Sequence, residues 1–348
     1  MKMKLNFKLN GFRRTMKRTI PVLLSAAIFF LLLLSLCGCG SPVSAGNGAL
    51  SVVTTVFPPY DFAREIGGEH ITVTQLLRPG AESHTFDPTP ADILLVQNCD
   101  LFLYVGGESD AWVDTLLAAA ENENRTVLRL IDMTDCMEEE TVEGMTVHEH
   151  EHEHEDAQEH GEEHVHEDSD EVEYDEHVWT SPKNAVDLCE GICAALCALD
   201  AEHGADYRNA CAAYTEKLSA LDARFTEITE NAPLHTLVFG DRFPFRYLCE
   251  DYGLSYRAAF PGCAAESEPS AATVAYLIKK IRAEGFPAVL SIELSNQKIA
   301  QAISGETGVP ILTLHSCHNR TAEEVERNET YLSLMEQNAC VLEQALNP

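Results

Sequence analysis

Residues 184–229 read NAVDLCEGICAALCALDAEHGADYRNACAAYTEKLSALDARFTEIT, and this stretch decides how the rest of the chain is organised. It contains no proline, and its apolar residues recur at the spacing of one face of an α-helix. A continuous helix of about 45 residues spans roughly 65 Å, which is enough to cross two lobes. Gly204 is the candidate point of interruption. We therefore predict a long rigid linking helix over residues 184–231.

Strand-like and helix-like segments alternate on both sides of this helix. In residues 49–183, an apolar strand pattern at 50–56 comes first. The sequence Thr-Pro-Ala-Asp at 89–92 then marks a helix start, with a capping hydroxyl and a proline at the first helical position. Residues 232–348 repeat the alternation, for example with a buried strand pattern at 288–292. This order predicts an α/β fold with two lobes, each built on a mainly parallel sheet.

The amino terminus has the layout of a secretory signal. Residues 2–18 carry seven basic residues and no acidic one, and residues 19–36 are almost purely apolar. A leucine three positions before Cys39 and a glycine just before it resemble a bacterial lipoprotein cleavage site. We therefore expect residues 1–38 to be removed, Cys39 to carry a lipid anchor on the outer face of the cytoplasmic membrane, and residues 39–48 to form a tether. An uncleaved membrane helix is the alternative, because the apolar run is close to the minimum length of a span.

Charge and cysteine usage restrict the possible partners. The chain has 24 basic and 56 acidic residues and a net charge of −32, which argues against nucleic acid and favours a cation. There is no C-x-x-C pair, so a structural zinc finger is not indicated. Cys189, Cys193 and Cys197 recur every four residues on one face of the predicted helix, where we expect plain burial. Disulfides are compatible with an extracytoplasmic location, but the sequence does not assign their pairing.

Residues 138–176 interrupt the alternation with 19 acidic residues and seven histidines. With so little to bury, this insertion of the N-terminal lobe is predicted to be disordered. Imidazoles and carboxylates on such a tether would hold zinc weakly and raise its local concentration. The alternative is a solvated charged loop with no role in metal binding. The histidines are His148, His150, His152, His154, His160, His164 and His166.

Two histidines outside the insertion lie in matching contexts. His84 lies in RPGAESHTFDP and His177 in DEHVWTSP, and each has an aromatic residue two positions later. Both are expected in loops at strand ends, where α/β lobes bind their ligands. Either one alone would be interpreted as an ordinary hydrogen-bonded loop residue. Together they indicate a zinc site, because zinc prefers a small shell of imidazole or thiolate ligands.

These two motifs, with the acidic histidine-rich insertion between them, resemble the zinc and manganese solute-binding lipoproteins of ABC importers. The resemblance covers nearly the whole mature chain, and residues 252–254 (YGL) and 268–270 (EPS) give it weaker support. It implies two lobes joined by a rigid helix and a metal bound by His84 and His177. It also implies a monomer that is not an enzyme and that delivers zinc to a membrane permease.

The second-lobe ligands depart from the family pattern. Arg242 occupies the position of the family's third histidine or glutamate, and a guanidinium does not bind a metal. Asp241 precedes it, and His315 occupies the position of the family's last aspartate. The expected shell is therefore His84, His177, His315 and Asp241, which favours Zn²⁺ over Mn²⁺. The alternative second-lobe ligands are Cys317, His318 and Glu293.

Two other functions fit parts of the pattern. A secreted zinc hydrolase would need an open metal position and a general base, and the sequence has no H-E-x-x-H motif. An adhesin-like surface lipoprotein that buffers metal would have many weak sites and no tight one. Titration of the purified chain with zinc separates these functions from zinc delivery.

Overall fold

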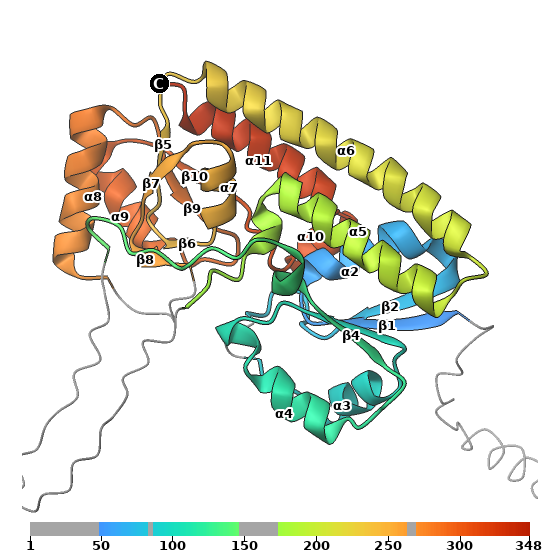
Figure 1. Ribbon diagram of the computed structural model, residues 1–348. Coiled ribbons are helices and arrows are strands. Elements are labelled where there is room, and N and C mark those ends of the chain that lie inside the picture. The colour runs from blue at the N-terminus through green and yellow to red at the C-terminus, as the bar shows by residue number, and fades with distance from the viewer. Residues whose placement is uncertain (1–48, 83–85, 146–172, 263–268) are drawn as a thin grey trace, which may run out of the picture. The chain divides into compact units, whose positions relative to one another are not determined.

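Four parallel strands form the sheet of the first lobe, in the order β2-β1-β3-β4 (Figure 1). The computed structural model describes residues 49–82, 86–145, 173–262 and 269–348. The strands are β1 (Leu50–Thr54), β2 (Ile71–Gln75), β3 (Leu101–Tyr104) and β4 (Thr126–Arg129). The helices of this lobe are α2 (Phe57–Gly67), α3 (Pro90–Gln97) and α4 (Trp112–Ala119).

The helix start predicted at residues 89–92 is confirmed. The Thr89 side chain accepts a hydrogen bond from Asp92 N, and Asp92 Oδ2 accepts one of 2.8 Å from Thr89 N. This reciprocal capping box satisfies two backbone donors that the first turn of α3 would otherwise leave open. It also fixes where the chain re-enters a helix after the loop that carries His84.

The predicted continuous helix over 184–231 is wrong in one respect, because it consists of two helices. These are α5 (Pro182–Leu199) and α6 (Gly204–Asn231), so Gly204 is indeed at the interruption. Asp200 leaves the helical conformation at φ −136°, and its carboxylate accepts a hydrogen bond of 2.8 Å from the hydroxyl of Tyr207. The polar turn between the helices folds α6 back against α5.

Of the two helices, α6 runs from one lobe to the other. It packs against α2 of the first lobe and against α11 (Tyr331–Ala345) of the second (Figure 1). Its 28 residues extend over roughly 42 Å, instead of the 65 Å expected for an uninterrupted helix. The predicted fold, two α/β lobes joined by a long helix, is thus confirmed. The helix that joins them is shorter than predicted.

The second lobe is built from short parallel strand pairs: β5 with β7, β9 with β10, and β6 with β8. A parallel bridge between Phe239 and Leu290 joins the β5 end to β9. The strands are β5 (Thr236–Val238), β6 (Arg242–Phe243), β7 (Ser255–Arg257), β8 (Phe260–Pro261), β9 (Val289–Ser291) and β10 (Ile311–Thr313). The remaining helices are α7 (Arg246–Asp251), α8 (Ala271–Glu284), α9 (Lys298–Thr307) and α10 (Ala322–Glu326).

The predicted disorder of residues 138–176 is wrong at both ends of that range. Residues 137–145, here called the strap, run along the second lobe. Arg246 pairs with Glu140 at 2.5 Å, and the Tyr276 hydroxyl donates a hydrogen bond of 3.0 Å to Glu143. Charge pairing of this kind fixes acidic residues that composition alone assigns to a solvated loop. Residues 146–172, with all seven histidines of the insertion, lie outside the described residues.

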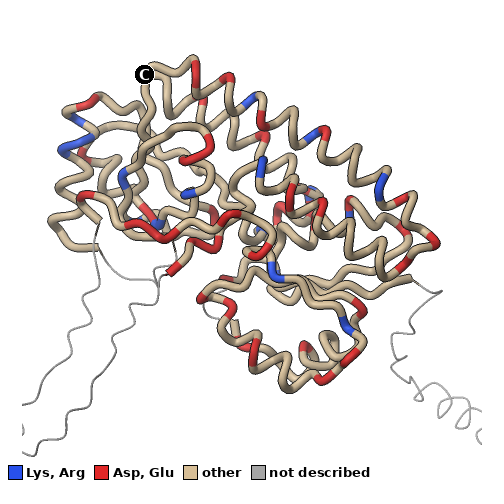
Figure 2. The backbone as a smooth tube through the Cα atoms, viewed as in Figure 1, with Lys and Arg blue, Asp and Glu red and all other residues tan. Residues whose placement is uncertain are grey.

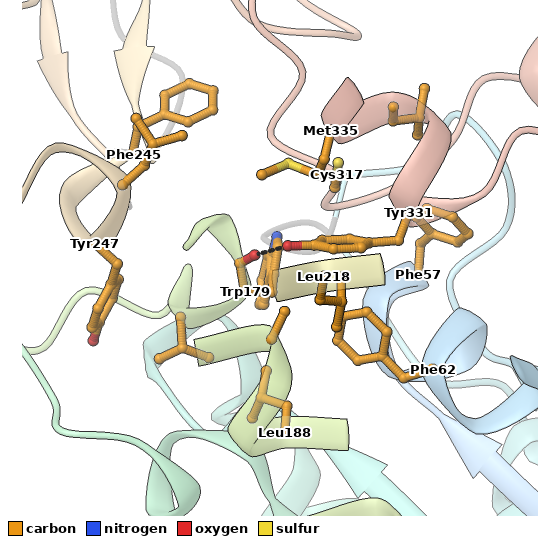
Figure 3. Close-up of a cluster of buried hydrophobic side chains, with 14 of the residues drawn as sticks. Phe57, Phe62, Trp179, Leu188, Leu218, Phe245, Tyr247, Cys317, Tyr331 and Met335 are labelled. Atoms are coloured by element: carbon orange, nitrogen blue, oxygen red, sulfur yellow. Dashed lines mark hydrogen bonds between the residues drawn. The ribbon is translucent and has the colours of Figure 1, made fainter. Parts of the chain in front are cut away.

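The two lobes share one hydrophobic core (Figure 3). Trp179 and Tyr331 are fully buried at its centre, and the Tyr331 hydroxyl donates a hydrogen bond of 2.5 Å to the Trp179 carbonyl oxygen. Leu188 of α5 and Leu218 of α6 pack in the same cluster. Opening the lobes as rigid bodies would expose this apolar surface to water, which is unfavourable.

The predicted signal peptide, Cys39 and nearly all of the predicted tether lie outside the described residues. Among the helices of the described part, none combines the length and the apolar character needed to cross a membrane.

Candidate metal centre

A small cavity lies where loops of the two lobes meet. Its volume is about 20 Å³, enough for one water molecule or one metal ion. Several of its walls follow the carboxyl ends of parallel strands, where open α/β sheets bind their ligands. The lining residues are Ala81, Glu82, His177, Arg242, Pro244, Gly262, Ile292, Glu293, Leu294, Ser316, His318 and Asn319.

His177 enters the cavity from the first lobe and is held by Asp175. The Asp175 Oδ1 atom accepts a hydrogen bond of 2.8 Å from the His177 amide and lies 3.1 Å from its ring Nδ1. Burial lowers the pKa of His177, but the Asp175 carboxylate more than offsets this and raises the pKa above 6.5. A carboxylate on one ring nitrogen orients the imidazole and leaves the other nitrogen for a metal.

His318 faces His177 from the second lobe. The centroids of their rings lie 5.8 Å apart, and the Trp179 ring lies 5.5 Å from each of them. The His318 carbonyl oxygen accepts a hydrogen bond of 3.2 Å from the amide of Phe57, at the start of α2. This residue is therefore tied to the first lobe, although its loop follows β10 of the second.

Glu293 contributes a carboxylate to the same cavity. Its Oε2 accepts a hydrogen bond of 2.7 Å from Ser316 N, and its Oε1 accepts one of 2.5 Å from Ser316 Oγ. Leu294 and Cys317, the neighbours of Glu293 and His318, both have φ near +60°. This conformation is uncommon for residues other than glycine, and such strain concentrates at functional sites.

The structure does not bring His315 to the cavity wall. Its side chain lies behind the wall, with Nδ1 3.6 Å from Glu293 Oε1 and Nε2 3.4 Å from Glu324 Oε1. The His315 Nδ1 atom also accepts a hydrogen bond of 2.9 Å from Cys317 N. Nδ1 thus holds the loop through the Cys317 amide, and Nε2 faces Glu324.

Asp241 and Cys317 are likewise absent from the lining. The Asp241 carboxylate accepts hydrogen bonds of 2.9 Å from Arg242 N and 3.4 Å from Ile292 N, and burial raises its pKa. Cys317 is fully buried, with its sulfur 3.8 Å from the carbonyl oxygen of His315. Both side chains stabilise the loops that surround the cavity.

His84 lies outside the described residues, but the loop that leads to it is fixed against the second lobe. The Asn319 Nδ2 atom donates hydrogen bonds of 2.6 Å to Arg78 O and 2.9 Å to Ala81 O. Arg242 Nη2 forms an ion pair of 3.0 Å with Glu82 Oε2. Arg242, which the resemblance places at a ligand position, thus forms an ion pair that joins the two lobes.

Within the part of the chain that the structure describes, no group of three or more His, Cys, Asp or Glu side chains is placed so that it could hold a metal ion. Sequence reasoning ranked His318 and Glu293 behind His315 and Asp241. It placed His315 first because this residue occupies the position of the family's last aspartate. In the structure, β10 ends at Thr313 and the backbone at Cys317 is left-handed, and His318, not His315, lines the cavity.

Comparison with known proteins places this geometry in context. A family model described as the periplasmic zinc-uptake complex component A matches residues 52–345. The zinc-binding lipoprotein AdcA of Streptococcus pneumoniae is 31% identical over 320 residues, which cover 90% of this chain and 60% of that protein. The high-affinity zinc uptake system protein ZnuA of Bacillus subtilis is 28% identical over 318 residues, which cover 90% of this chain and 94% of that protein.

Among solved structures, the Zn(II)-bound ZnuA-like domain of S. pneumoniae AdcA matches with a TM-score of 0.68 and 27% identity. The match covers 86% of this chain and 100% of that domain. The chain therefore spans about 60% of the length of the AdcA protein and nearly all of its zinc-binding ZnuA-like part.

Proposed function

The chain belongs to the family of periplasmic zinc-uptake component A proteins, and from this premise we propose that it captures Zn²⁺ outside the cytoplasmic membrane and delivers it to an ABC importer. The observation that carries the proposal is the pair of facing imidazoles, His177 and His318, 5.8 Å apart at the wall of a cavity of ion size. Two imidazoles that bind one tetrahedral zinc at about 2.1 Å have ring centroids roughly 5 Å apart. A small inward movement of either ring is enough to bring both onto one ion.

We propose His84, His177, His318 and Glu293 as the zinc ligands. Glu293 and His318 replace Asp241 and His315 of the sequence-based shell, because they line the cavity with His177. His84 is retained, since Ala81 and Glu82 just before it line the same cavity. Three imidazoles and one carboxylate suit zinc better than manganese, which prefers more oxygen ligands.

Capture and release would involve loop movements more than rotation of the lobes. The shared core around Trp179 and Tyr331 resists opening, whereas the Arg242–Glu82 ion pair and the 315–319 loop lie at the cavity itself. A permease that displaces the loop carrying His318 would remove a second-lobe ligand without unpacking the core. This is the step at which the zinc would leave.

The acidic character of the chain supports attraction of a cation. Figure 2 shows acidic residues along both lobes, and they outnumber basic residues 56 to 24 in the sequence. The histidine-rich stretch within 146–172 begins at the strap and returns two residues before Asp175, the hydrogen-bond partner of His177. We propose that it holds zinc weakly and raises its concentration close to the cavity.

The location and the mode of attachment are proposals as well. A relative is named a zinc-binding lipoprotein, and the family is described as periplasmic. Together with the signal-like residues 1–38, this supports lipidation at Cys39 and anchoring to the outer face of the membrane. A monomer without enzymatic activity is sufficient for the proposed role, since the cavity is built from a single chain.

Zinc titration of the mature chain tests the proposal. The histidine-rich residues 146–172 are replaced by a short Gly/Ser linker so that weak sites do not obscure the tight one. One tight equivalent is expected, and it should be lost in His177→Ala and His318→Ala. The exposed His235 provides the matched control, because His235→Ala should titrate as the parent does. Several weak equivalents and no tight one would instead support a surface metal buffer.

A further inference from the structure

Four cysteines meet where α5 packs against α6, outside the zinc cavity. Cys189, Cys193 and Cys197 follow one another along α5, and Cys211 comes from α6. Cys189 is fully buried, and Cys193 and Cys211 are each 6% exposed. The proposed zinc site makes no use of these thiols.

The two helices form an antiparallel hairpin, which places the cysteines of α5 opposite residues of α6. Near the turn, Cys197 Sγ lies 3.4 Å from the carbonyl oxygen of Gly204, the first residue of α6. Farther from the turn, Cys211 Sγ lies 3.6 Å from the carbonyl oxygen of Cys189. In an α-helix that carbonyl accepts a hydrogen bond from the amide four residues later, which is that of Cys193. The Cys211 sulfur is therefore level with Cys193 on the facing helix.

Disulfide geometry rules out the pairs that lie within one helix. Side chains four residues apart on a helix have Cβ atoms about 5–6 Å apart, whereas a disulfide needs about 3.5–4.5 Å. This excludes Cys189 with Cys193, and Cys193 with Cys197. A bond must therefore cross between the helices, where the Cys211 sulfur lies 3.6 Å from the Cys189 carbonyl oxygen and level with Cys193.

We propose that Cys193 and Cys211 form a disulfide that fastens α5 to α6 when the chain folds outside the cytoplasm. This inference rests on the proposed extracytoplasmic location, where disulfides persist. One Sγ–Sγ bond forms and two S–H bonds break. The two electrons and the two protons pass to a disulfide-bearing oxidant, whose own S–S bond breaks as it becomes a dithiol. The thiols are reduced in the structure described here.

Burial determines when this bond can form. It raises the pKa of Cys193 to about 12, so the folded protein holds this group as a thiol and not as the reactive thiolate. Exchange should proceed during folding, before the hairpin closes. The resulting bond encloses the turn at residues 200–203 and restricts the unfolded chain, which stabilises the connecting helix α6.

Oxidative refolding tests the proposal. The mature chain is refolded either in a mixture of oxidised and reduced glutathione or in dithiothreitol, alkylated under denaturing conditions, and digested for mass spectrometry. In glutathione, the peptide with Cys211 should be linked to the α5 peptide, and the Tm should be several degrees higher than in dithiothreitol. Cys193→Ser and Cys211→Ser should each remove the link and the Tm difference, whereas Cys197→Ser and the exposed Cys340→Ser should retain both.

Full alkylation of Cys193 and Cys211 after refolding in glutathione would overturn the proposal, and so would a link that survives Cys193→Ser. Zinc stoichiometry measured on the same samples keeps the two proposals separate. A missing disulfide with one tight zinc equivalent refutes only the disulfide. A disulfide without tight zinc binding refutes only the transport function.

Discussion

The indole Nε1 of Trp179 donates a hydrogen bond of 2.8 Å to the carbonyl oxygen of Ser316. Trp179 is two residues after His177, and Ser316 is two residues before His318. This one bond therefore joins the two chain segments that carry the facing imidazoles. Because Trp179 is fully buried in the core shared by both lobes, the spacing of the imidazoles is set by the core and not by the cavity alone.

Trp179→Phe should weaken zinc binding by about tenfold or more, because a smaller ring supports both imidazoles less well and the hydrogen bond to Ser316 is lost. It should also lower the free energy of unfolding by about 1–3 kcal/mol, since the buried Ser316 carbonyl loses its donor. Zinc titration and denaturant unfolding measure the two effects. Trp112 is the only other tryptophan and packs on Phe86 in a separate cluster, so Trp112→Phe should leave zinc affinity unchanged. Unchanged affinity in Trp179→Phe would show that the core does not set the site.

Asp175→Asn should reduce zinc affinity by about 10- to 100-fold while the protein remains folded. An amide oxygen can still accept the hydrogen bond from the His177 amide, but the negative charge that orients the ring and increases its basicity is removed. Competition with a zinc chelator gives the affinity, and circular dichroism confirms the fold. Asp114→Asn, at an exposed carboxylate of α4, serves as the charge-matched control. Equal affinities in the two variants would contradict the role given to Asp175.

The metal-free protein should become less stable as the pH rises from about 5 to 7. Burial raises the pKa of Asp61 to about 6, although the Tyr331 amide partly lowers it, and burial likewise raises the pKa of Asp110 to about 6. Both pKa values exceed the unfolded value, so the folded state binds these protons more tightly. The stability they contribute is present at low pH and is lost as the pH rises through about 6.

Asp61→Asn should reduce the loss of stability between pH 5 and 7 by about 1 kcal/mol, because one carboxyl group with a pKa of about 6 releases about one proton over that range. The variant keeps an acceptor for the Tyr331 amide, which donates to Asp61 Oδ2 at 2.8 Å. Denaturant unfolding at a series of pH values, with a chelator present, measures the slope. A parent protein whose stability increases from pH 5 to 7 would refute the assignment.

Two deletions within the acidic insertion should differ in their effects on the Tm and on zinc binding. Replacing residues 146–172 by a short linker should preserve both the Tm and the tight zinc equivalent, because the strap and Asp175 remain. Deleting 138–176 should lower the Tm and abolish tight binding, because it removes the Glu140–Arg246 and Glu143–Tyr276 contacts and the partner of His177. Thermal unfolding and zinc titration compare the two. Equal Tm values and equal zinc binding in the two variants would mean that the strap contributes neither to stability nor to the zinc site.

The sequence predicted the lobes well because their signals are local. Alternation of apolar segments, the Thr89 capping box and the motif around His177 depend on neighbouring residues, and the structure places each as expected. The helix break at Asp200–His203 was harder to locate, since polar residues at a turn also suit an exposed helix face. The strap was missed because its order comes from partners in the second lobe, such as Arg246 and Tyr276, more than 100 positions away.

The sequence alone could not predict which second-lobe residues line the cavity, because this depends on long-range geometry. The sequence offers His315, Cys317 and His318 within four positions, and only the backbone turn at Cys317 determines which side chain reaches His177. Residue types alone also do not show that Asp241 accepts hydrogen bonds from two backbone amides. The structure places His177 at the cavity wall, and its role as a zinc ligand stays a prediction, as do the roles of the other members of the shell.

A crystal structure of the zinc-loaded mature chain, with the zinc position determined by anomalous scattering, tests the central claim most directly. We predict one peak between the ring nitrogens of His177 and His318, within coordination distance of both and with Glu293 beside it. A peak at His315 and Asp241, or zinc found only along residues 146–172, would contradict the account.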